Sequence, residues 1–467
     1  MNDTLLTFVP PDFIDTKGER RLMIWRELGV WLVMDPELFA FAEKFDGTAT
    51  VEAAIAAHGK EWQKDSATVH KEAALIIPEM VRRQVLRPVG RPVETVEEPL
   101  SIANITLNLT NRCNLKCSFC YNRDRKTEEA PIEQIARFIA QGKSAMTDDA
   151  AVIVLGGEPF LQPERLLSFL RRAPELIAKP PMVSTNGTRL TKELAAQLKE
   201  VPVEVQVSLD SADPAVHDKG RGDGVFRRAL GGVERLVEAG IHTILSMVFT
   251  SETVGGIEPF LDLAAQLGVD EARFIPLRSM GASADANALA RPDLMIGLEI
   301  LLDVLKRKPE HARFLGRDFF SIAMVQCARS ASRVSCGIGR RVIFIDADGA
   351  LYPCPNHVDD THRLGHVNTI SLQEVLRESS ATEALRARYH VDRYTKCAEC
   401  PFKRWCAGDC RGEVLSMTSD PAAPSPYCES IQAMYTRILR LLAQGDPRAT
   451  RLAGALSADA AVKTFLT

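Results

Sequence analysis

The chain has 467 residues, of which 46% are hydrophobic and 25% are charged, a composition that suits a globular protein of about two to four domains. Lysine and arginine total 57 against 61 aspartates and glutamates, so the net charge is -4 and the pI is near 6.2, and we expect neither nucleic acid nor a membrane surface as a partner. Residues 1–12 lack a signal-peptide pattern, and no segment holds the roughly 20 apolar residues that cross a bilayer. The sequence therefore predicts a cytoplasmic location.

Residues 1–90 are predicted to form a small winged-helix-like unit. Two short apolar runs, Arg21–Trp25 and Val30–Met34, are joined by a turn that contains glycine, which predicts a hairpin. Apolar residues at helical spacing then predict three helices, from Pro36 to about residue 45, over Val51–His58 and from Ala67 to about Arg83. A stretch rich in proline and glutamate predicts a linker at residues 91–100.

Residues 101–310 alternate candidate strands and helices. The candidate strands are Ile105–Leu109, Val152–Leu155, Met182–Ser184, Val203–Leu209, Thr243–Phe249 and Arg273–Ile275. The candidate helices are Ile132–Gly142, Glu164–Arg172, Thr191–Glu200, Arg227–Ala239 and Glu258–Leu267. Six such repeats predict an α/β fold with parallel strands and right-handed crossovers, which is either an incomplete barrel or a doubly wound sheet. Functional residues are expected at the carboxyl ends of the strands.

After a predicted helix over about residues 288–308, the chain becomes rich in cysteine, glycine and turns. Residues 311–445 contain few continuous apolar elements, so we expect bound metal to fold this region, with a closing helix over Ser430–Ala443. Residues 446–467 are predicted to be a C-terminal tail.

The chain contains 11 cysteines. In a reducing compartment, clustered cysteines are metal ligands more often than disulfides, and an odd count cannot pair completely. Cys113, Cys117 and Cys120 follow the first candidate barrel strand with the spacing C-x3-C-x2-C, and the other eight lie between Cys327 and Cys428. Since a cube of four irons and four sulfides takes four thiolates, the eight can complete two clusters, and the trio leaves one iron open to a ligand. A zinc knuckle without its fourth ligand is the alternative for the trio.

The segment from Thr110 to Tyr121 resembles the cysteine loop of the radical S-adenosylmethionine (SAM) superfamily. The resemblance implies a partial (β/α)6 TIM barrel whose first strand precedes this loop. It also implies that Cys113, Cys117 and Cys120 bind a 4Fe-4S cluster, and that SAM chelates the open iron and is cleaved to methionine and a 5'-deoxyadenosyl radical. Tyr121 would then pack near the adenine.

Three further strand ends carry candidate contacts to SAM. The run Gly156-Gly157-Glu158 is similar to the Gly-Gly-Glu motif with which the family binds the SAM amino group. Hydroxyl and carboxylate groups at the next two strand ends can hold ribose hydroxyls, and Arg221 can pair with a carboxylate. The alternative is that some of these residues only shape turns, and that His217 only caps a helix. The candidate cofactor contacts are Tyr121, Gly156, Gly157, Glu158, Ser184, Asn186, Ser208, Asp210 and Arg221.

The C-terminal cysteines resemble the SPASM domain of radical SAM peptide-modifying enzymes, which holds two auxiliary 4Fe-4S clusters. The pattern is C-x12-G-x4-C, then C-x2-C-x5-C-x3-C, then a last cysteine. The resemblance implies that the first auxiliary cluster is bound by Cys336, Cys354 and Cys410, completed by Cys327, and the second by Cys397, Cys400, Cys406 and Cys428.

With the trio, this assignment implies three 4Fe-4S clusters. Cys327 lies outside the seven-cysteine pattern, and without it the first auxiliary cluster would have an open site for substrate. A zinc ribbon is the alternative, but it leaves the remaining cysteines unexplained. Its ligands would be Cys397, Cys400, Cys406 and Cys410.

The acid or base of the reaction is not evident from the sequence. Sulfatase maturases of the SPASM group carry an aspartate just after the cysteine equivalent to Cys354, whereas Pro355 and Asn356 follow here, so that activity is not expected. The candidates that remain are Asp346, Asp348 and His357, although the two aspartates flank Gly349 as turn residues do.

The N-terminal unit resembles the PqqD-like peptide-recognition domain of several peptide maturases, which captures a leader peptide as an added strand at a sheet edge. The rival is a DNA-binding winged helix, which needs a basic face. Residues 1–90 contain 11 Lys plus Arg against 14 Asp plus Glu, so leader binding is favoured.

The sequence thus predicts a radical SAM maturase that oxidatively modifies, for example by crosslinking, a ribosomally made precursor peptide. The auxiliary clusters would accept the surplus electron. A reductant of the flavodoxin or ferredoxin type would supply electrons to the cluster bound by Cys113, Cys117 and Cys120. One alternative is a radical SAM enzyme that acts on a small molecule or tetrapyrrole. The other is a non-catalytic iron-sulfur electron carrier, which would have no use for the Gly-Gly-Glu motif.

Overall fold

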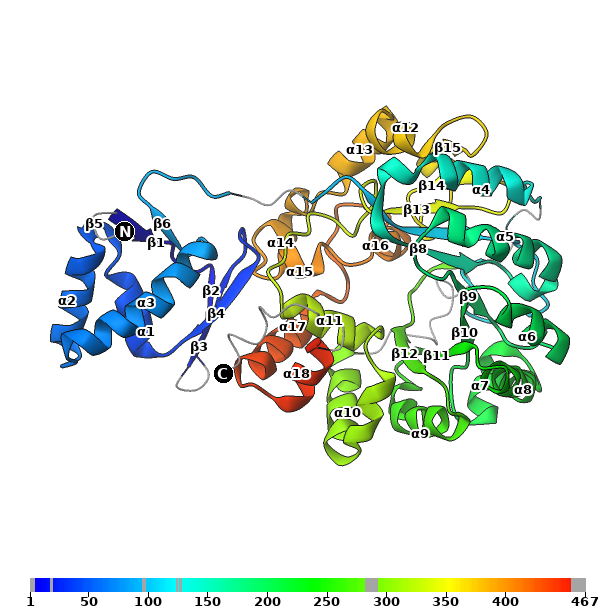
Figure 1. The fold of residues 1–467 in the computed structure, drawn as a ribbon, viewed down its shortest axis with the longest axis horizontal. Coiled ribbons are helices and arrows are strands. Elements are labelled where there is room, and N and C mark those ends of the chain that lie inside the picture. The colour runs from blue at the N-terminus through cyan, green and yellow to red at the C-terminus, as the bar shows by residue number, and fades with distance from the viewer. Residues whose placement is uncertain are drawn as a thin grey trace.

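The computed structural model describes residues 5–16, 20–94, 98–122, 125, 128–281 and 293–454. Figure 1 shows a small N-terminal unit beside a larger body, in which a parallel sheet with its helices adjoins the cysteine-rich C-terminal region. Among the described residues, no helix combines the length and the apolar character that membrane crossing requires.

The N-terminal unit contains two antiparallel three-stranded sheets and three helices. One sheet has the order β2-β3-β4, from Phe13–Asp15, Arg21–Trp25 and Val30–Met34, and the other has the order β5-β1-β6, from Asp46–Thr50, Leu5–Phe8 and Leu86–Pro88. The helices are α1 (Pro36–Glu43), α2 (Val51–Glu61) and α3 (Ser66–Arg82). The predicted hairpin and all three helices are confirmed.

The unit has a hydrophobic core of its own, in which Met23, Trp25, Phe41 and Phe45 are at most 3% exposed. Strands β1, β2, β5 and β6 were not predicted. They are only three to five residues long, so their own sequences carry little strand signal, and β1, β5 and β6 pair with distant segments.

Six parallel strands form the centre of the larger body in the consecutive order β7 to β12. They are β7 (Ile102–Asn108), β8 (Met146–Leu155), β9 (Met182–Thr185), β10 (Glu204–Ser208), β11 (His242–Phe249) and β12 (Glu271–Pro276). Consecutive order places every right-handed crossover helix on the same face, so the sheet is a partial barrel and not a doubly wound sheet.

The helices between these strands match the predicted ones, with one addition. They are α4 (Ile132–Gln141), α5 (Pro163–Leu176), α6 (Lys192–Lys199), α7 (Pro214–Arg221), α8 (Val225–Glu238) and α9 (Ile257–Leu267). The short helix α7 was missed because only His217 among its eight residues is buried, which leaves no apolar stripe to recognise.

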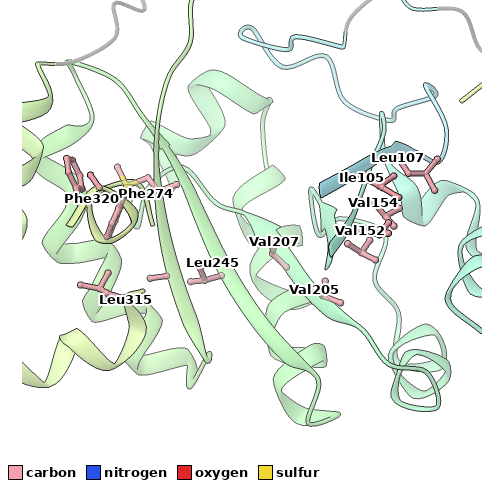
Figure 2. Packing of buried hydrophobic residues seen from close by; sticks show 14 of the residues in the cluster. Ile105, Leu107, Val152, Val154, Val205, Val207, Leu245, Phe274, Leu315 and Phe320 are labelled. Atoms are coloured by element: carbon pink, nitrogen blue, oxygen red, sulfur yellow. The ribbon is translucent and has the colours of Figure 1, made fainter. Parts of the chain in front are cut away.

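The barrel strands alternate apolar and polar side chains. Figure 2 shows apolar side chains of β7, β8, β10, β11 and β12, such as Ile105, Val154 and Val207, in the buried core. The intervening positions are polar: Gln206 Nε2 donates to Ser184 Oγ at 3.3 Å, and Arg273 Nη1 donates to Gln206 Oε1 at 3.1 Å. Since successive residues of a strand face opposite sides, these polar groups line the barrel interior.

The C-terminal region continues the barrel sheet, which corrects the expectation that metal alone would organise it. Strand β13 (Val342–Ile345) pairs in parallel with β7 at the edge of the barrel, and β14 (Ala350–Tyr352) and β15 (Gly365–His366) follow antiparallel. The helices are α10 (Leu294–Arg307), α11 (Phe319–Cys327), α12 (Leu372–Arg377), α13 (Ser380–Arg388), α14 (Thr395–Ala398), α15 (Lys403–Cys406), α16 (Arg411–Thr418), α17 (Cys428–Ala443) and α18 (Pro447–Gly454).

Two ends of predicted segments differ from expectation. The predicted tail begins with α18, whose Ala449, Leu452 and Ala453 are at most 1% exposed, and which packs against α11. The predicted helix over 288–308 corresponds to α10, which begins at Leu294, and residues 288–292 lie outside the described residues. The predicted domain limits stay predictions.

The β3–β4 turn of the N-terminal unit docks against the cysteine-rich region. Glu27 Oε1 accepts from Lys403 Nζ at 2.5 Å, and the Trp31 indole Nε1 donates to the Cys327 carbonyl at 2.6 Å. Gly29 has φ +59°, and a Cβ at this position would lie 1.7 Å from the carbonyl oxygen of Ala331. Only glycine permits this approach, so the contact is specific to the docked arrangement.

Candidate active site

The cysteine trio lies in the loop directly after β7, at the carboxyl end of the barrel strands. Asparagine side chains hold the base of this loop: Asn108 Nδ2 donates to Asn111 Oδ1 at 2.9 Å, and Asn111 Nδ2 donates to Asp346 Oδ1 at 3.0 Å. Cys113 is exposed, and Cys117 and Cys120 are partly buried. The structure therefore presents three thiols at the mouth of a polar barrel interior, where the sequence predicted them.

The glycines of the Gly-Gly-Glu run are required by the cysteine loop. Gly157 N donates to Thr110 O at 2.7 Å, and a Cβ at Gly156 would lie 2.4 Å from that same oxygen. A Cβ at Gly157 would lie 2.1 Å from Arg112 O. The backbone of this run therefore packs directly against the start of the cysteine loop. This contact is visible only in the folded chain.

Glu158 is fully buried, and protein groups already bind its carboxylate. Its oxygens accept from Thr185 Oγ1 and Asn186 N, each at 2.7 Å, and from Phe160 N at 3.0 Å. Burial raises the pKa of this carboxyl, while these hydrogen bonds act in the opposite direction. Glu158 thus ties the end of β8 to the turn after β9. Its predicted contact with the SAM amino group stays a prediction.

Asn186 joins this turn to the cysteine loop. Its Nδ2 donates to Asn114 Oδ1 at 3.0 Å, and its Oδ1 accepts from Thr188 Oγ1 at 2.6 Å. Ser184 and Ser208 occupy interior-facing positions of β9 and β10. They remain available for a ligand in the barrel interior.

Asp210 and Arg221 pair with each other. Arg221 Nε and Nη2 donate to the two Asp210 oxygens at 2.5 and 3.1 Å, and the side chains are only 10% and 9% exposed. The Arg221 guanidinium lies 5.2 Å from the centroid of the Phe119 ring, inside the cysteine loop, and it lowers the pKa of Cys117 against the raising effect of burial. The pair therefore supports the trio loop from α7 and β10.

His217 and Tyr121 are also placed by the structure. His217 Nδ1 accepts from the backbone N–H of Asp210 at 3.1 Å, and burial lowers the pKa of this histidine to about 4, so it is neutral near pH 7. Burial raises the pKa of Tyr121 to about 12, and the Arg125 guanidinium lies 5.6 Å from its ring. His217 lies within α7, whose N-cap residue is Asp213, and its hydrogen bond goes to the backbone of Asp210 after β10, so the helix-capping alternative does not match the structure.

The C-terminal cysteines fall into two groups in space. A cavity of about 340 Å³ is lined by Cys336, Cys354 and Cys410, and also by Cys406, which lines the second cavity described below as well. Asn356 Nδ2 approaches Cys410 Sγ at 3.3 Å, as donors to cluster sulfurs do. These three cysteines are the first auxiliary set.

Four cysteines line a second, smaller cavity, and Gln432 Nε2 donates to Cys400 Sγ at 3.5 Å. They are Cys397, Cys400, Cys406 and Cys428, the second auxiliary set. Because Cys410 lies with Cys336 and Cys354, the zinc-ribbon grouping does not match the structure. The donor sets consist of cysteine sulfur with amide groups beside them, which fits iron-sulfur clusters.

Cys327 stands apart from both sets. It is fully buried at the end of α11, and burial is the only cause that raises the pKa of its thiol. The pKa of Cys354, in contrast, is raised by burial together with neighbouring Cys336 and Cys410. The predicted ligand role of Cys327 therefore gains no support from its surroundings.

We expect Cys327→Ala to retain all the iron of the parent protein after anaerobic reconstitution. Cys354→Ala, the matched control, should lose one cluster, or about four irons per chain. Iron and sulfide analysis checks both variants. An equal loss of iron in Cys327→Ala would show that Cys327 is a cluster ligand.

The three acid-base candidates have structural partners. Asp346 Oδ1 accepts from Asn111 and from its neighbour Ala347 N, and Asp348 Oδ1 accepts from Ala350 N at 2.9 Å, as a turn residue does. His357 is 2% exposed, with Nδ1 3.2 Å from Cys354 Sγ, and burial lowers its pKa to about 4. Their roles in proton transfer stay predictions.

Sequence reasoning missed two groups that build the site. The asparagines at 108, 111 and 114 recur at intervals of three, a signal that could have been noticed. Arg278, just after β12, pairs with Glu413 at 2.9 Å and lines the cavity of the first auxiliary set. It joins the barrel mouth to that set, and no local sequence signal marks it.

Comparison with known proteins agrees with this geometry. Residues 107–264 match the model of the radical SAM superfamily, and residues 336–401 match that of the SPASM iron-sulfur cluster-binding domain. The mycofactocin maturase MftC of Mycobacterium tuberculosis (strain CDC 1551 / Oshkosh) is 31% identical over 350 residues, which cover 73% of this chain and 86% of that protein. The chain belongs to the radical SAM/SPASM family. Membership implies that this radical SAM protein uses iron-sulfur clusters and SAM.

Other relatives of this radical SAM protein differ in what they do. The AdoMet-dependent heme synthase of Methanosarcina barkeri is 25% identical over 342 residues, covering 69% of this chain and 95% of the relative.

Solved structures share the fold. Native anSMEcpe with bound AdoMet has a TM-score of 0.61 at 20% identity and covers 75% of this chain and 99% of its own. Streptococcus suis SuiB bound to precursor peptide SuiA has a TM-score of 0.56 at 15% identity and covers 91% of this chain and 98% of its own. The wider SuiB match reaches into residues 1–90.

Proposed function

We propose that this chain is a radical SAM maturase that oxidatively modifies a ribosomally made precursor peptide. The observation that carries the proposal is the combination of an open three-cysteine loop at the barrel mouth with two separate auxiliary cysteine sets. The 31% identity with a mycofactocin maturase and the fold shared with SuiB support it.

The three cysteine groups would hold three 4Fe-4S clusters, with the trio at Cys113, Cys117 and Cys120. When bound there, the cluster and SAM supply a 5'-deoxyadenosyl radical that removes hydrogen from substrate. Tyr121, Ser184, Asn186 and Ser208 are proposed SAM contacts; Ser184 and Ser208 face the barrel interior, whereas the Asn186 amide is already bonded to Asn114 and Thr188. The remaining proposed contacts, Gly156, Gly157, Glu158, Asp210 and Arg221, would act by shaping the backbone around SAM.

In this proposal the substrate binds between the trio and the first auxiliary set. Arg125 Nη2 donates to Pro355 O at 3.1 Å, so the cysteine loop and the segment after Cys354 lie together. A peptide residue held at this junction would be near both a radical source and an electron acceptor. A reductant of the flavodoxin or ferredoxin type would reduce the cluster bound by the trio.

Among the described residues, β4 is an edge strand of the sheet β2-β3-β4, and we propose that a leader peptide pairs with it. Asp12 N donates to Ile24 O, so the backbone of Ile24 faces β2. Trp31 lies opposite Ile24 in the β3–β4 register, and in an antiparallel ladder its N–H and C=O therefore point away from β3. The same holds for Val33, two residues further along.

The surroundings of this edge support peptide capture. Arg83 Nη1 donates to the outward carbonyl of Trp31 at 3.3 Å from the end of α3. A cavity of about 620 Å³ adjoins Val30 and is lined by Arg83 and Gln84 on one side and Ser330 and Ser332 on the other. An added strand along β4 would thus lead from the N-terminal unit towards the cysteine-rich region.

Val33→Pro tests this mode of binding. The proline removes an outward N–H without breaking a β3–β4 hydrogen bond, so the unit should fold. We expect the affinity for the precursor peptide to fall about tenfold, since one main-chain hydrogen bond and the fit of the added strand are lost. SAM cleavage without peptide should not change.

Val33→Thr, which keeps the N–H and the strand propensity, is the control and should bind as the parent does. Fluorescence anisotropy with labelled peptide measures both variants. Unchanged affinity in Val33→Pro would mean that the leader does not add to β4.

A further inference from the structure

Arg411 is a buried cation without a carboxylate partner among the described residues. Its side chain is 0% exposed. Other buried cations among the described residues have an acidic partner: Lys403 and Arg404 pair with Glu27, and Arg273 pairs with Glu271. Burying a charge without a counter-charge is costly, so the folded protein must supply compensation elsewhere.

Neutral groups surround the Arg411 guanidinium. It donates to the carbonyl oxygens of Gly408, Pro421 and Ala423 at 2.7, 2.7 and 2.6 Å, and it lies 4.1 Å from the centroid of the Tyr394 ring. Its Nε is buried without a hydrogen-bond partner. Carbonyl oxygens and an aromatic ring can solvate a cation, but they carry no net charge and do not neutralise it.

Arg411 lies between the two auxiliary cysteine sets. It directly follows Cys410 and lines the cavity with Cys336 and Cys354 of the first set. Gly408, whose carbonyl accepts from Arg411 at 2.7 Å, lines the cavity of the second set. The thiolate-bound clusters proposed for these two sites would be negatively charged groups on either side of Arg411.

We propose that Arg411 is the shared counter-charge of the two auxiliary sites and raises the reduction potentials of the clusters bound there. This inference rests on the proposed assignment of clusters to both sets. The step concerned is [4Fe-4S]2+ plus one electron giving [4Fe-4S]+, and the electron comes from the substrate-derived radical in turnover or from dithionite in a titration. A fixed positive charge favours the more negative, reduced cluster.

A purely structural role is the rival explanation, because three carbonyl bonds also hold the segment from Gly408 to Ala423. Two substitutions separate charge from hydrogen bonding. Arg411→Gln removes the charge, whereas Arg411→Lys keeps it and loses part of the hydrogen-bond set. Arg437→Gln, which removes a partly exposed arginine paired with Glu299, is the matched control.

The test is a dithionite titration followed by electron paramagnetic resonance on the full chain. The background carries Cys113→Ala, Cys117→Ala and Cys120→Ala, so that only auxiliary clusters contribute. We expect Arg411→Gln to shift the reduction equilibrium of at least the first auxiliary cluster about tenfold towards the oxidised form, a fall of about 59 mV for one electron. Arg411→Lys and Arg437→Gln should titrate close to the background protein.

Loss of auxiliary iron in Arg411→Gln with retention in Arg411→Lys would support the same role. Equal shifts in Arg411→Gln and Arg411→Lys, or no shift in either, would overturn it and leave the cluster assignment intact. Absence of auxiliary iron from the background protein itself would overturn both.

Discussion

Replacing Cys117 with alanine is expected to abolish reductive cleavage of SAM while both auxiliary cysteine sets keep their iron. Cys117 is the central thiol of the loop after β7, and a cluster held by the two remaining thiolates would have no defined open iron. Iron should fall from about twelve to about eight per chain, because only one of three clusters is lost. Chromatography of 5'-deoxyadenosine and iron analysis measure the two effects.

Ser118→Ala is the control for this experiment. Ser118 lies in the same loop, and its hydroxyl donates to Gly220 O at 3.4 Å, so the substitution disturbs the loop without removing a thiol. It should keep its iron and cleave SAM. Normal SAM cleavage by Cys117→Ala would show that the trio is not required for this reaction.

Asp210→Asn should produce the largest loss of stability, about 3–5 kcal/mol, because it leaves the buried Arg221 charge uncompensated. The two side chains are 10% and 9% exposed and form two hydrogen bonds, and Asp210 Oδ1 also accepts from Val248 N at 3.1 Å. Urea unfolding should show a lower midpoint with an unchanged slope. Since Arg221 lies against Phe119, the cysteine loop should become more susceptible to proteolysis as well.

Two further variants make this result specific. Asp210→Asn combined with Arg221→Met removes both charges and should recover part of the stability. Lys219 lies on the same helix as Arg221, and Lys219→Gln breaks its exposed pair with Glu252, which follows β11. This should change stability by less than about 1 kcal/mol. A similar small change in Asp210→Asn would show that the pair does not support the loop.

The parts of the fold that could be predicted are those whose pattern of apolar residues lies within one short segment of the chain. The β3–β4 hairpin and the barrel strands consist of continuous or alternating apolar residues, and their predicted positions are confirmed. The order of the six strands could not be read from the sequence. It follows from hydrogen bonding between segments 22 to 47 residues apart, and it decides between the barrel and the doubly wound sheet.

The candidate site was predictable in its residue types and less so in their contacts. The spacing of the cysteines placed the trio after β7, and the grouping of the C-terminal set follows the pattern of the resemblance. Glu158 was read as a ligand for an ammonium, but the folded chain brings Thr185 and Asn186 to its carboxylate. Neither partner is near Glu158 in sequence, so no local pattern could reveal them.

Mass spectrometry of the precursor peptide after coexpression tests the proposed function most directly. Short reading frames beside the gene for this chain supply the candidate peptides. With the parent chain, we predict a loss of about 2 Da from one core residue or pair, as expected for radical removal of hydrogen and closure of a bond, and no change with Cys117→Ala. Formation of 5'-deoxyadenosine with every candidate peptide left at its original mass would contradict the account.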